Sequence, residues 1–298
     1  MSAITCRDLT KTYGKTDALH QLSCTIAADA ITGIVGPNGA GKTTLLKCIA
    51  GHYYPTSGTI RVYDRDPYDD LTLAASLIFV DETMTFPDGQ RLGQIFDLYR
   101  RFYANWDQTL AEKLLDYFGL PADRLPQTLS KGMLSTFRSI IGLSAHAPLT
   151  ILDEPTTGMD SGVRQDFYRA LLKDYLAHPR TILISSHLLA EIEDLLEYLL
   201  LLDQGSVLLS APVTELAAYA LSLSGKTERL QPLLAQRTIL RQGSPLSGYL
   251  TVVVVNDLTP AEQAALTDAG ITMTAVNLND LCITLTARHK GGIDHVFA

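Results

Sequence analysis

The sequence contains no apolar run long enough to cross a membrane as a helix. Its longest apolar stretch, from Leu195 to Leu202, is interrupted by Glu197 and falls far short of the ~18 residues that a spanning helix needs. The segment from Met1 to Asp8 also lacks the basic start and apolar core of a secretory signal. We therefore expect a chain that stays in the cytoplasm.

Paired cysteines, clustered histidines and excess positive charge are also missing. The four cysteines show no C-x-x-C spacing and the seven histidines no H-x-x-x-H spacing, so we expect buried reduced thiols and no structural metal. The formal charge of −8 argues against a broad nucleic-acid surface, which usually carries clustered lysine and arginine. The balance favours protein or small-molecule partners, and no nucleic acid.

The most informative segment that is present has the spacing G-x-x-x-x-G-K-[ST], which predicts a nucleoside triphosphate site. Its glycines let the backbone wrap around a phosphate with N–H groups pointing inward, an arrangement that side chains would obstruct. The lysine neutralises outer phosphate charge, and the threonine hydroxyl can bind Mg²⁺. The candidate nucleotide-binding residues are Gly36, Pro37, Asn38, Gly39, Ala40, Gly41, Lys42, Thr43 and Thr44.

The segments on either side of this loop fit a phosphate site. The run from Ile31 to Val35 is apolar and rich in β-branched residues, which is typical of a buried strand. From Thr44 to Ala50 the apolar residues recur at helical spacing, and Gly51 follows at a C-cap position. Strand, loop and helix in this order aim a helix N-terminus at the phosphates. An ordinary glycine-rich turn is the alternative, and the specificity of the motif argues against it.

Two further apolar segments end in chemically active residues. A strand over 149–154 ends in Asp153 and Glu154, and a strand over 181–186 is followed by His187. In a parallel sheet these ends share an edge with the phosphate loop. There Asp153 can hold Mg²⁺, Glu154 can orient the attacking water, and His187 can reach the γ-phosphate. Taken alone, the acidic pair could open a solvated turn, and the histidine could be a capping or packing residue.

A second anion-binding feature is predicted in the segment from Leu129 to Met133. Ser130 is a good N-cap residue, so the segment reads first as an ordinary helix start. A serine hydroxyl, the small Gly132 and the added Lys131 at a helix N-terminus also suit a phosphate group.

Together these motifs resemble the ATP-binding subunits of ABC transporters, and the resemblance covers roughly residues 3 to 215. It implies an ATP hydrolase with ATP and Mg²⁺ as cofactors. Its fold would be α/β, a P-loop NTPase core with an antiparallel β subdomain and an inserted helical lobe at about 87–142. The implied roles are catalysis for Glu154 and His187, Mg²⁺ binding for Asp153, adenine stacking for Tyr13, and signalling across a dimer for Asp160. Tyr13 as a plain strand residue remains an alternative.

The chain has one phosphate loop and one signature, and these face different ways on one domain. Two chains must therefore pair head to tail, with each ATP between Lys42 of one and Ser130, Lys131 and Gly132 of the other. The resemblance implies two partners, a second ATP-binding subunit and a multi-span membrane permease, at the cytoplasmic face of a bacterial membrane. The form L-S-K-G-M resembles small bacterial exporters, including antibiotic-resistance types, without naming a cargo.

The sequence departs from the family pattern in two places. The usual signature is L-S-G-G-Q, whereas Lys131 and Met133 occupy its third and fifth positions here. The segment from Phe79 to Pro87 lacks the glutamine that touches Mg²⁺ and water in the family. Spacing back from Pro87 favours Asp81 as its replacement, with Glu82 as the rival. This departure puts the strength of metal coupling in doubt, and not nucleotide binding.

With 298 residues, 46% of them hydrophobic, the chain is long enough for two ordinary domains. We expect an ATP-binding domain over 1–215 and, beyond a boundary near Pro212, a small α+β domain over 219–298. The order of elements predicted there, β-α-β-β-α-β, resembles a ferredoxin-like fold. Because this segment carries no catalytic constellation, a dimerisation or stabilising role is favoured over a regulatory ligand site.

Two other functions compete with transport. One is a soluble ATPase of the same fold acting on ribosomes or nucleic acid, but such relatives join two domains or insert coiled coils, which are missing here, and the chain is acidic. The other is a nucleotide-gated binding protein without turnover, which Glu154 and His187 oppose.

Overall fold

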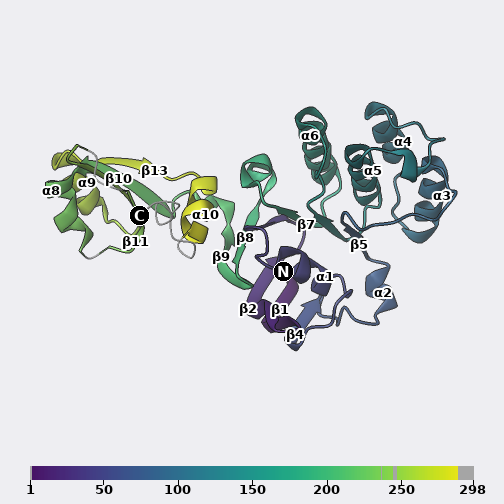
Figure 1. Cartoon of the computed structure of the whole chain (residues 1–298), viewed down its shortest axis with the longest axis horizontal. Coiled ribbons are helices and arrows are strands. Elements are labelled where there is room, and N and C mark those ends of the chain that lie inside the picture. The colour runs from purple at the N-terminus through teal and green to yellow at the C-terminus, as the bar shows by residue number, and fades with distance from the viewer. Residues whose placement is uncertain (1, 236, 244–246, 288–298) are drawn as a thin grey trace. The chain divides into compact units, whose positions relative to one another are not determined.

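The structure is a computed structural model that describes residues 2–235, 237–243 and 247–287. These residues form two compact units, one over 1–210 and one from Ala211 onward. Figure 1 shows the elements of each unit in chain order. Among the described residues, no helix is long and apolar enough to cross a membrane.

A six-stranded sheet forms the centre of the first unit. Its strands lie in the order β5-β6-β7-β3-β8-β9, and the pairs β5·β6, β6·β7, β3·β7 and β3·β8 are parallel. The strands span Ile31–Val35 (β3), Leu77–Val80 (β5), Leu149–Asp153 (β6), Thr181–Ser186 (β7), Tyr198–Asp203 (β8) and Ser206–Pro212 (β9). Every residue of β3, β6 and β7 is buried, as expected for parallel strands covered on both faces.

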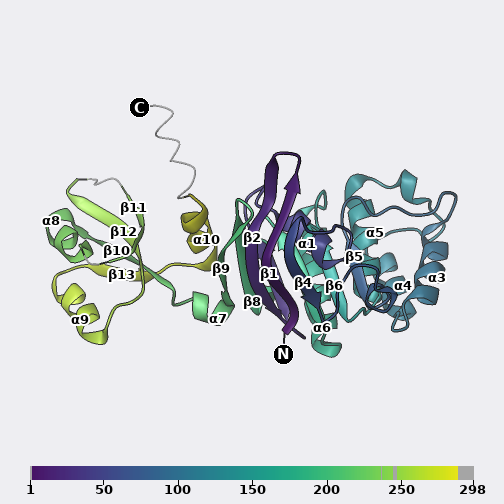
Figure 2. The ribbon, with the colours of Figure 1, turned by 90° about the horizontal axis from the view of Figure 1, so that it is seen from below.

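A three-stranded antiparallel sheet with the order β2-β1-β4 accompanies it. Its strands are Ser2–Tyr13 (β1), Thr16–Ala27 (β2) and Ser57–Val62 (β4). One apolar core joins the two sheets through helix α1 (Lys42–Ile49), whose Leu45, Leu46 and Ile49 are fully buried. In Figure 2, β1, β2 and β4 lie beside α1. This core holds the phosphate-loop helix firmly against the sheet whose edge carries the loop.

The inserted lobe is helical, as the sequence predicts. It contains α3 (Leu92–Phe102), α4 (Gln108–Tyr117), the 3-10 turn η1 (Pro126–Thr128) and α5 (Lys131–Ser144). Of its aromatic residues, Phe96 is buried and stacks on Phe137 with ring centroids 5.4 Å apart, whereas Phe102 is exposed, so the aromatic face is only partly core. The remaining helical elements of this unit are α2 (Leu71–Ala74), α6 (Ser161–Ala177), η2 (Leu189–Glu191) and η3 (Glu193–Leu195).

The second unit contains a four-stranded antiparallel sheet with the order β11-β12-β10-β13. Its residues Leu223, Val252 and Val254 form a core with Leu230 and Leu266 from the helical segments. The elements are α7 (Val213–Leu216), β10 (Ala220–Lys226), α8 (Thr227–Leu230), η4 (Gln231–Leu234), β11 (Ile239–Gln242), β12 (Tyr249–Val255), α9 (Pro260–Asp268), β13 (Thr272–Ala275) and α10 (Leu278–Ala287).

The predicted order of elements in this unit is confirmed, with one helix shorter than expected. The helix predicted over 227–235 is α8 followed by the 3-10 turn η4, and Pro232 lies in the first turn of η4. Proline has no N–H to donate, so a 3-10 turn replaces a regular helix there. Elsewhere the strands predicted at 31–35 and 181–186 are confirmed at those residues.

Candidate functional site

A cavity of ≈ 650 Å³ opens at the carboxyl ends of the parallel strands of the first unit. The sequence-predicted residues from Asn38 to Thr44 line it, together with Tyr13, Asp81, Glu82, Asp153, Glu154 and His187. Four further lining residues, Ala18, Lys47, Thr83 and Thr157, carry no motif in the sequence. The three strand ends singled out from sequence therefore meet at one site.

The phosphate loop runs from the end of β3 to the start of α1. Its glycine requirement at Gly36 and Gly41 comes from neighbouring backbone, because an added Cβ would lie 2.2 Å from the Leu202 carbonyl and 2.5 Å from the Ala18 carbonyl. At Gly39 nothing lies within 4 Å, but its φ of +83° favours glycine. The structure therefore requires glycine because of neighbouring backbone and positive φ, whereas the sequence suggested that side chains would obstruct the phosphate.

Lys42 is the first residue of α1 and is buried. Its ammonium donates to the carbonyls of Gly36 at 2.8 Å and Pro37 at 3.2 Å, and it lies 3.8 Å from Glu154 Oε1. Burial lowers the pKa of Lys42, while the nearby carboxylates of Glu154 and Asp153 oppose that shift. Lys42 therefore places its positive charge at the N-terminus of α1, where a phosphate anion is favoured.

Ser185 joins the two acidic residues that end β6. Its hydroxyl donates to Asp153 Oδ1 at 2.5 Å and accepts from the Glu154 backbone N–H at 2.9 Å. Glu154 has a φ of +49°, a left-handed conformation that costs a non-glycine residue about 1–2 kcal/mol. Such strain is typical of functional positions. Sequence reasoning treated Ser185 only as part of a strand and missed this role.

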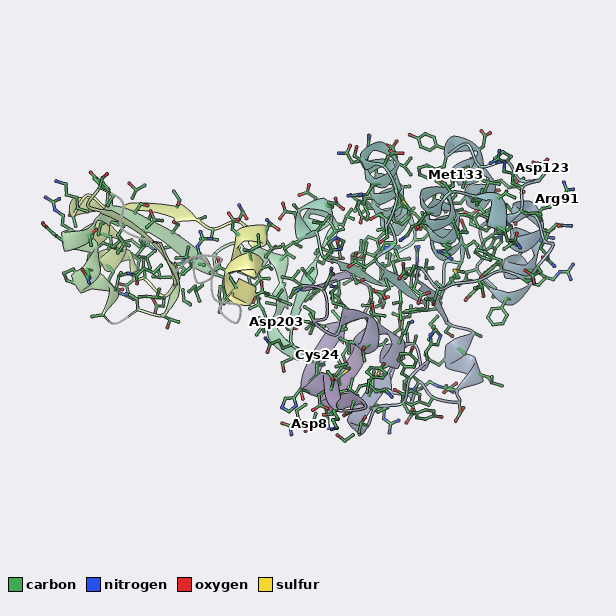
Figure 3. The ribbon with its side chains drawn as sticks, viewed as in Figure 1. Asp8, Cys24, Arg91, Asp123, Met133 and Asp203 are labelled. Carbon is green, nitrogen blue, oxygen red and sulfur yellow. The ribbon has the colours of Figure 1, made fainter. Side chains whose placement is uncertain are left out.

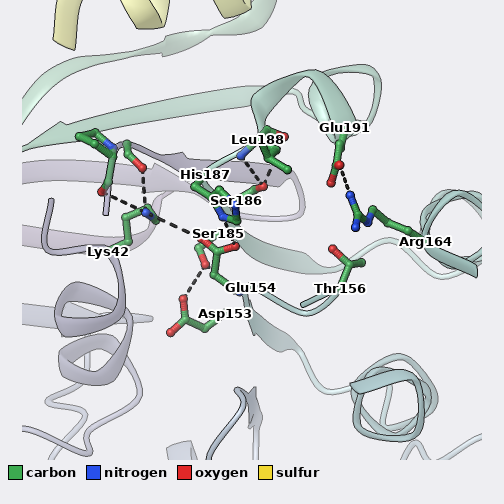
Figure 4. A network of polar contacts seen from close by, with 12 residues as sticks. Lys42, Asp153, Glu154, Thr156, Arg164, Ser185, Ser186, His187, Leu188 and Glu191 are labelled. Atoms are coloured by element: carbon green, nitrogen blue, oxygen red, sulfur yellow. Dashed lines mark hydrogen bonds and ion pairs between the residues drawn. The ribbon is translucent and has the colours of Figure 1, made fainter. Parts of the chain in front are cut away.

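Glu154 brings three motifs together, as Figure 4 shows. One carboxylate oxygen forms a hydrogen bond with His187 Nδ1 at 2.8 Å, and the other faces Lys42. The side chain of Glu154 is 28% exposed and that of His187 is 47% exposed, so both remain accessible from the cavity. A carboxylate held between a lysine and a histidine, open to solvent, is suited to accept a proton from water.

The residues present fit a magnesium ion. Thr43 and Asp153 line the cavity and offer a hydroxyl and a carboxylate oxygen, and Mg²⁺ prefers oxygen ligands of this kind. Asp81 also lines it, and its side chain accepts from the Thr83 N–H at 2.9 Å and lies 3.2 Å from Lys47 Nζ. Burial raises the pKa of Asp81, but the hydrogen bonds from Thr83 and the charge of Lys47 outweigh it, so the net pKa is lowered.

Tyr13 lies at the rim of the same cavity. Its ring is half exposed and makes an edge contact with Tyr53, with ring centroids 6.1 Å apart. The Lys11 ammonium lies 5.4 Å from the centre of the Tyr13 ring. An exposed aromatic ring beside the phosphate loop offers a flat apolar surface to a base. Tyr53 was not predicted from the sequence, because nothing in its local pattern separates it from other surface tyrosines.

A second contact in Figure 4 joins two loops that adjoin the site. Arg164 of α6 donates to the Met159 carbonyl at 3.2 Å and pairs with Glu191 of η2. Met159 immediately precedes Asp160, and Glu191 lies four residues after His187. The ion pair therefore links the loop of Asp160 to the loop of His187. Neither Arg164 nor Glu191 belongs to a motif that the sequence singled out.

Comparison with known proteins agrees with this geometry. The family model for the ABC transporter matches residues 19–157. The daunorubicin/doxorubicin resistance ATP-binding protein DrrA of Streptomyces peucetius is 31% identical over 278 residues, which covers 89% of this chain and 81% of that protein. The chain belongs to the ABC transporter ATP-binding subunits. The ABC transporter ATP-binding protein YtrB of Bacillus subtilis (strain 168) is 29% identical and covers 68% of this chain and 70% of its own length.

The solved structures support the fold of this ABC ATP-binding subunit. A dimeric bacterial ABC transporter cassette matches with a TM-score of 0.61 and 24% identity, covering 70% of this chain and 98% of that one. The family model and the DrrA match identify the chain as an ABC transporter ATPase, as its sequence resemblance implies. The DrrA match covers 89% of the chain, and because the first unit is 210 of 298 residues, it extends into the second unit.

The signature residues of this ABC subunit lie outside the cavity. Ser130 caps α5 by accepting from the Met133 N–H at 3.3 Å, and Asp160 caps α6 by accepting from the Val163 N–H at 2.9 Å. Gly132 packs against the chain ahead of Asp160, since an added Cβ would lie 2.3 Å from the Gly158 carbonyl. Lys131 Nζ lies 3.8 Å from Glu82 on the surface. Within one chain, these residues and the phosphate loop do not form one site.

A histidine-containing cluster also exists at the other end of the sheet, where the sequence spacing did not suggest one. His146, Asp174 and His178 have ligand-type atoms within 4.8 Å of one another. Asp174 already forms a hydrogen bond with His146 at 2.8 Å and an ion pair with Arg180 at 2.8 Å. Because the guanidinium compensates the carboxylate, we interpret the cluster as part of an ion-pair network centred on the buried Asp174, which connects α6 to the start of β7.

Proposed function

We propose that the cavity of this ABC transporter ATPase binds ATP with Mg²⁺, and that Glu154 orients and deprotonates the attacking water. The observation that carries the proposal is the convergence of Lys42, Asp153, Glu154 and His187 at one sheet edge. Lys42 and the loop N–H groups, from Gly39 to Thr44, hold the phosphates, and Tyr13 stacks on adenine. His187 orients Glu154 and faces the γ-phosphate. Thr43 and Asp153 would hold Mg²⁺, which would neutralise negative charge at the phosphates.

We infer that two chains pair head to tail. Ser130, Lys131 and Gly132 lie away from the cavity of their own chain, at the N-terminus of α5, where a phosphate is favoured. The partner's cavity supplies that phosphate in a paired arrangement, and Asp160 meets the partner near the same place. The dimeric cassette among the similar structures supports pairing of this kind.

We further propose that the pair powers a separate multi-span permease from the cytoplasmic face of a bacterial membrane, and that transport is outward. DrrA carries the name of a drug-resistance ATP-binding protein, which supports export. A separate pocket of ≈ 410 Å³, lined by Phe79, Met84 and Phe102 among others, would receive a helix of the permease. The transported molecule is a property of that permease.

For the second unit, we propose a ferredoxin-like fold and an accessory role in dimerisation or stability. Its element order is β-α-β-β-α-β and its strand order is β11-β12-β10-β13, with all neighbours antiparallel, which support this assignment. We propose domain limits of 1–215 and 219–298. A variant that ends after residue 215 should still fold and bind ATP, and weaker dimerisation in it would support the role. Loss of folding would reject these limits.

The central test replaces Glu154 by Gln. We expect ATP binding to be retained, kcat to fall by about 10²–10⁴-fold, and an ATP-bound dimer to accumulate in light scattering, because the proton acceptor is lost while the phosphate contacts remain. Lys42→Ala should instead weaken nucleotide binding. Asp194→Asn, an exposed acid in the segment after His187, serves as the matched control. Wild-type turnover in Glu154→Gln would overturn the assignment.

A further inference from the structure

Asp81 lines the cavity with a carboxylate where the family resemblance implies a neutral glutamine, so the chain carries an additional charge beside the proposed phosphate site. The side chain of Asp81 is only 7% exposed. A buried carboxylate without compensation is costly, and it would repel a triphosphate in the same cavity. A neighbouring cation is therefore needed to compensate the charge of Asp81.

Lys47 is that group. It follows Thr43 by four residues on α1, so both residues lie on one face of the helix and both line the cavity. Its ammonium lies 3.2 Å from Asp81 Oδ2 and is itself only 15% exposed. It also lies 5.7 Å from the centre of the Tyr53 ring, which borders the pair on the side of Tyr13. The pair is therefore shielded from solvent on several sides.

Hydrogen bonds from Thr83 fix the carboxylate that faces Lys47. The Thr83 hydroxyl lies 2.8 Å from both Asp81 oxygens, and its N–H donates at 2.9 Å to Oδ1. Glu82 also lines the cavity, but its side chain is 70% exposed and its contact, Lys131, lies 3.8 Å away on the surface. A surface pair of this kind is screened and worth little. The geometry therefore selects Asp81, rather than Glu82, as the residue in the place of the glutamine.

We propose that Lys47 is a positioning residue for the nucleotide site, and that the Lys47–Asp81 ion pair stands in for the family's neutral glutamine. The pair carries no net charge, so it leaves the cavity as receptive to a triphosphate as an amide would. Removing Lys47 leaves the negative charge of Asp81 uncompensated, and removing Asp81 leaves the positive charge of Lys47 uncompensated. This inference rests on the proposed function, since it concerns ATP in the same cavity.

The test measures the dissociation constant of ATP, first in EDTA and then with Mg²⁺, by titration calorimetry on the full chain. Lys47→Met leaves a bare carboxylate and should weaken metal-free binding about 10-fold, with less loss when Mg²⁺ is present. Asp81→Asn leaves a bare ammonium and should tighten metal-free binding. The double variant should return close to wild type, because no net charge is left.

The pattern of signs separates this proposal from its alternatives. If Lys47 binds phosphate directly, the double variant stays as weak as Lys47→Met, and the proposal is overturned. If the pair is only structural, both single variants lower the melting temperature and leave binding unchanged, which also overturns it. Should Lys47→Met fail to fold, Asp81→Asn alone still decides, because tighter metal-free binding is expected and unchanged or weaker binding rejects the idea.

Matched controls come from the helical lobe. Lys113→Met and Asp123→Asn each remove one exposed charge, and Figure 3 labels Asp123 at the edge of that lobe. Both should change ATP binding by less than about 2-fold, because exposed charges beyond a Debye length are screened. Failure of the proposed function is recognised separately: Lys42→Ala would then bind ATP as well as wild type. Loss of binding in Lys42→Ala without the predicted sign pattern rejects the Lys47 inference alone.

Discussion

Two histidine–carboxylate pairs lie at opposite ends of the parallel strands of the six-stranded sheet, and their surroundings suit them to different roles. His187 and Glu154 follow the carboxyl ends of β7 and β6, whereas His146 and Asp174 precede the amino ends of those strands. In both pairs the imidazole nitrogen and the carboxylate oxygen are 2.8 Å apart. The hydrogen bond itself therefore does not distinguish a catalytic pair from a structural one.

Exposure and charge compensation distinguish them. Asp174 is 6% exposed and lies between His146 and the buried guanidinium of Arg180, so a neighbouring cation compensates its charge. Glu154 is partly exposed, borders a cavity, and has a strained backbone. A carboxylate that must exchange protons with water needs access, and one that holds elements together needs burial. Glu154 meets the first requirement and Asp174 the second.

The largest expected effect comes from breaking the structural pair. Asp174→Ala should lower the free energy of unfolding by about 3–5 kcal/mol, because it leaves the buried charge of Arg180 without its partner. Urea unfolding followed by circular dichroism measures this. Asp194→Ala removes an exposed acid and should stay within about 0.5 kcal/mol of wild type. A loss below about 1 kcal/mol in Asp174→Ala would argue against a structural role for this ion pair.

The proposed catalytic pair, Glu154 and His187, should respond in the opposite way. His187→Ala should lower kcat by about 10²–10⁴-fold, because Glu154 loses the group that orients it, while the exposed position keeps the stability nearly unchanged. His146→Ala should destabilise the fold and leave kcat of the folded protein close to wild type. Steady-state ATPase assays and urea unfolding on both variants check the contrast. A similar loss of kcat in the two would erase the distinction drawn between the pairs.

Acid should sharpen the comparison through Asp174. Burial raises its pKa, but the hydrogen bond with His146 and the charge of Arg180 outweigh this, so the folded-state pKa lies below the unfolded one. A depressed carboxyl pKa adds stability that is present above the unfolded pKa and is lost as pH falls through the folded pKa. Wild type should therefore lose stability below about pH 4, and Asp174→Asn should show a flatter profile there. Parallel profiles for the two proteins would contradict this.

Much of the cavity end of the sheet could be predicted from sequence, whereas the end with His146 and Asp174 could not. Short motifs such as Gly36 to Thr44 carry their chemistry in contiguous residues, and the parallel sheet brings their ends together. Some contacts depend on the fold because they join residues more than 25 positions apart along the chain. These contacts involve Ser185, Lys47 and Arg164. His146, Asp174 and Arg180 come from three separate segments for the same reason.

The smallest expected effect concerns Lys131, which lies at the first residue of α5 with Glu82 nearby. A cation at a helix N-terminus is unfavourable by about 0.3–1 kcal/mol, and an exposed ion pair offsets a similar amount. The two terms nearly cancel, so Lys131→Gln should change the free energy of unfolding by less than about 0.5 kcal/mol. If Lys131 contacts the partner's phosphates in a head-to-tail dimer, the same variant should still weaken ATP-dependent dimerisation in Glu154→Gln, most clearly at low salt, where charge contacts are least screened. Light scattering with ATP at two salt concentrations measures this. Unchanged dimerisation at both would mean that Lys131 serves only its own chain, through Glu82.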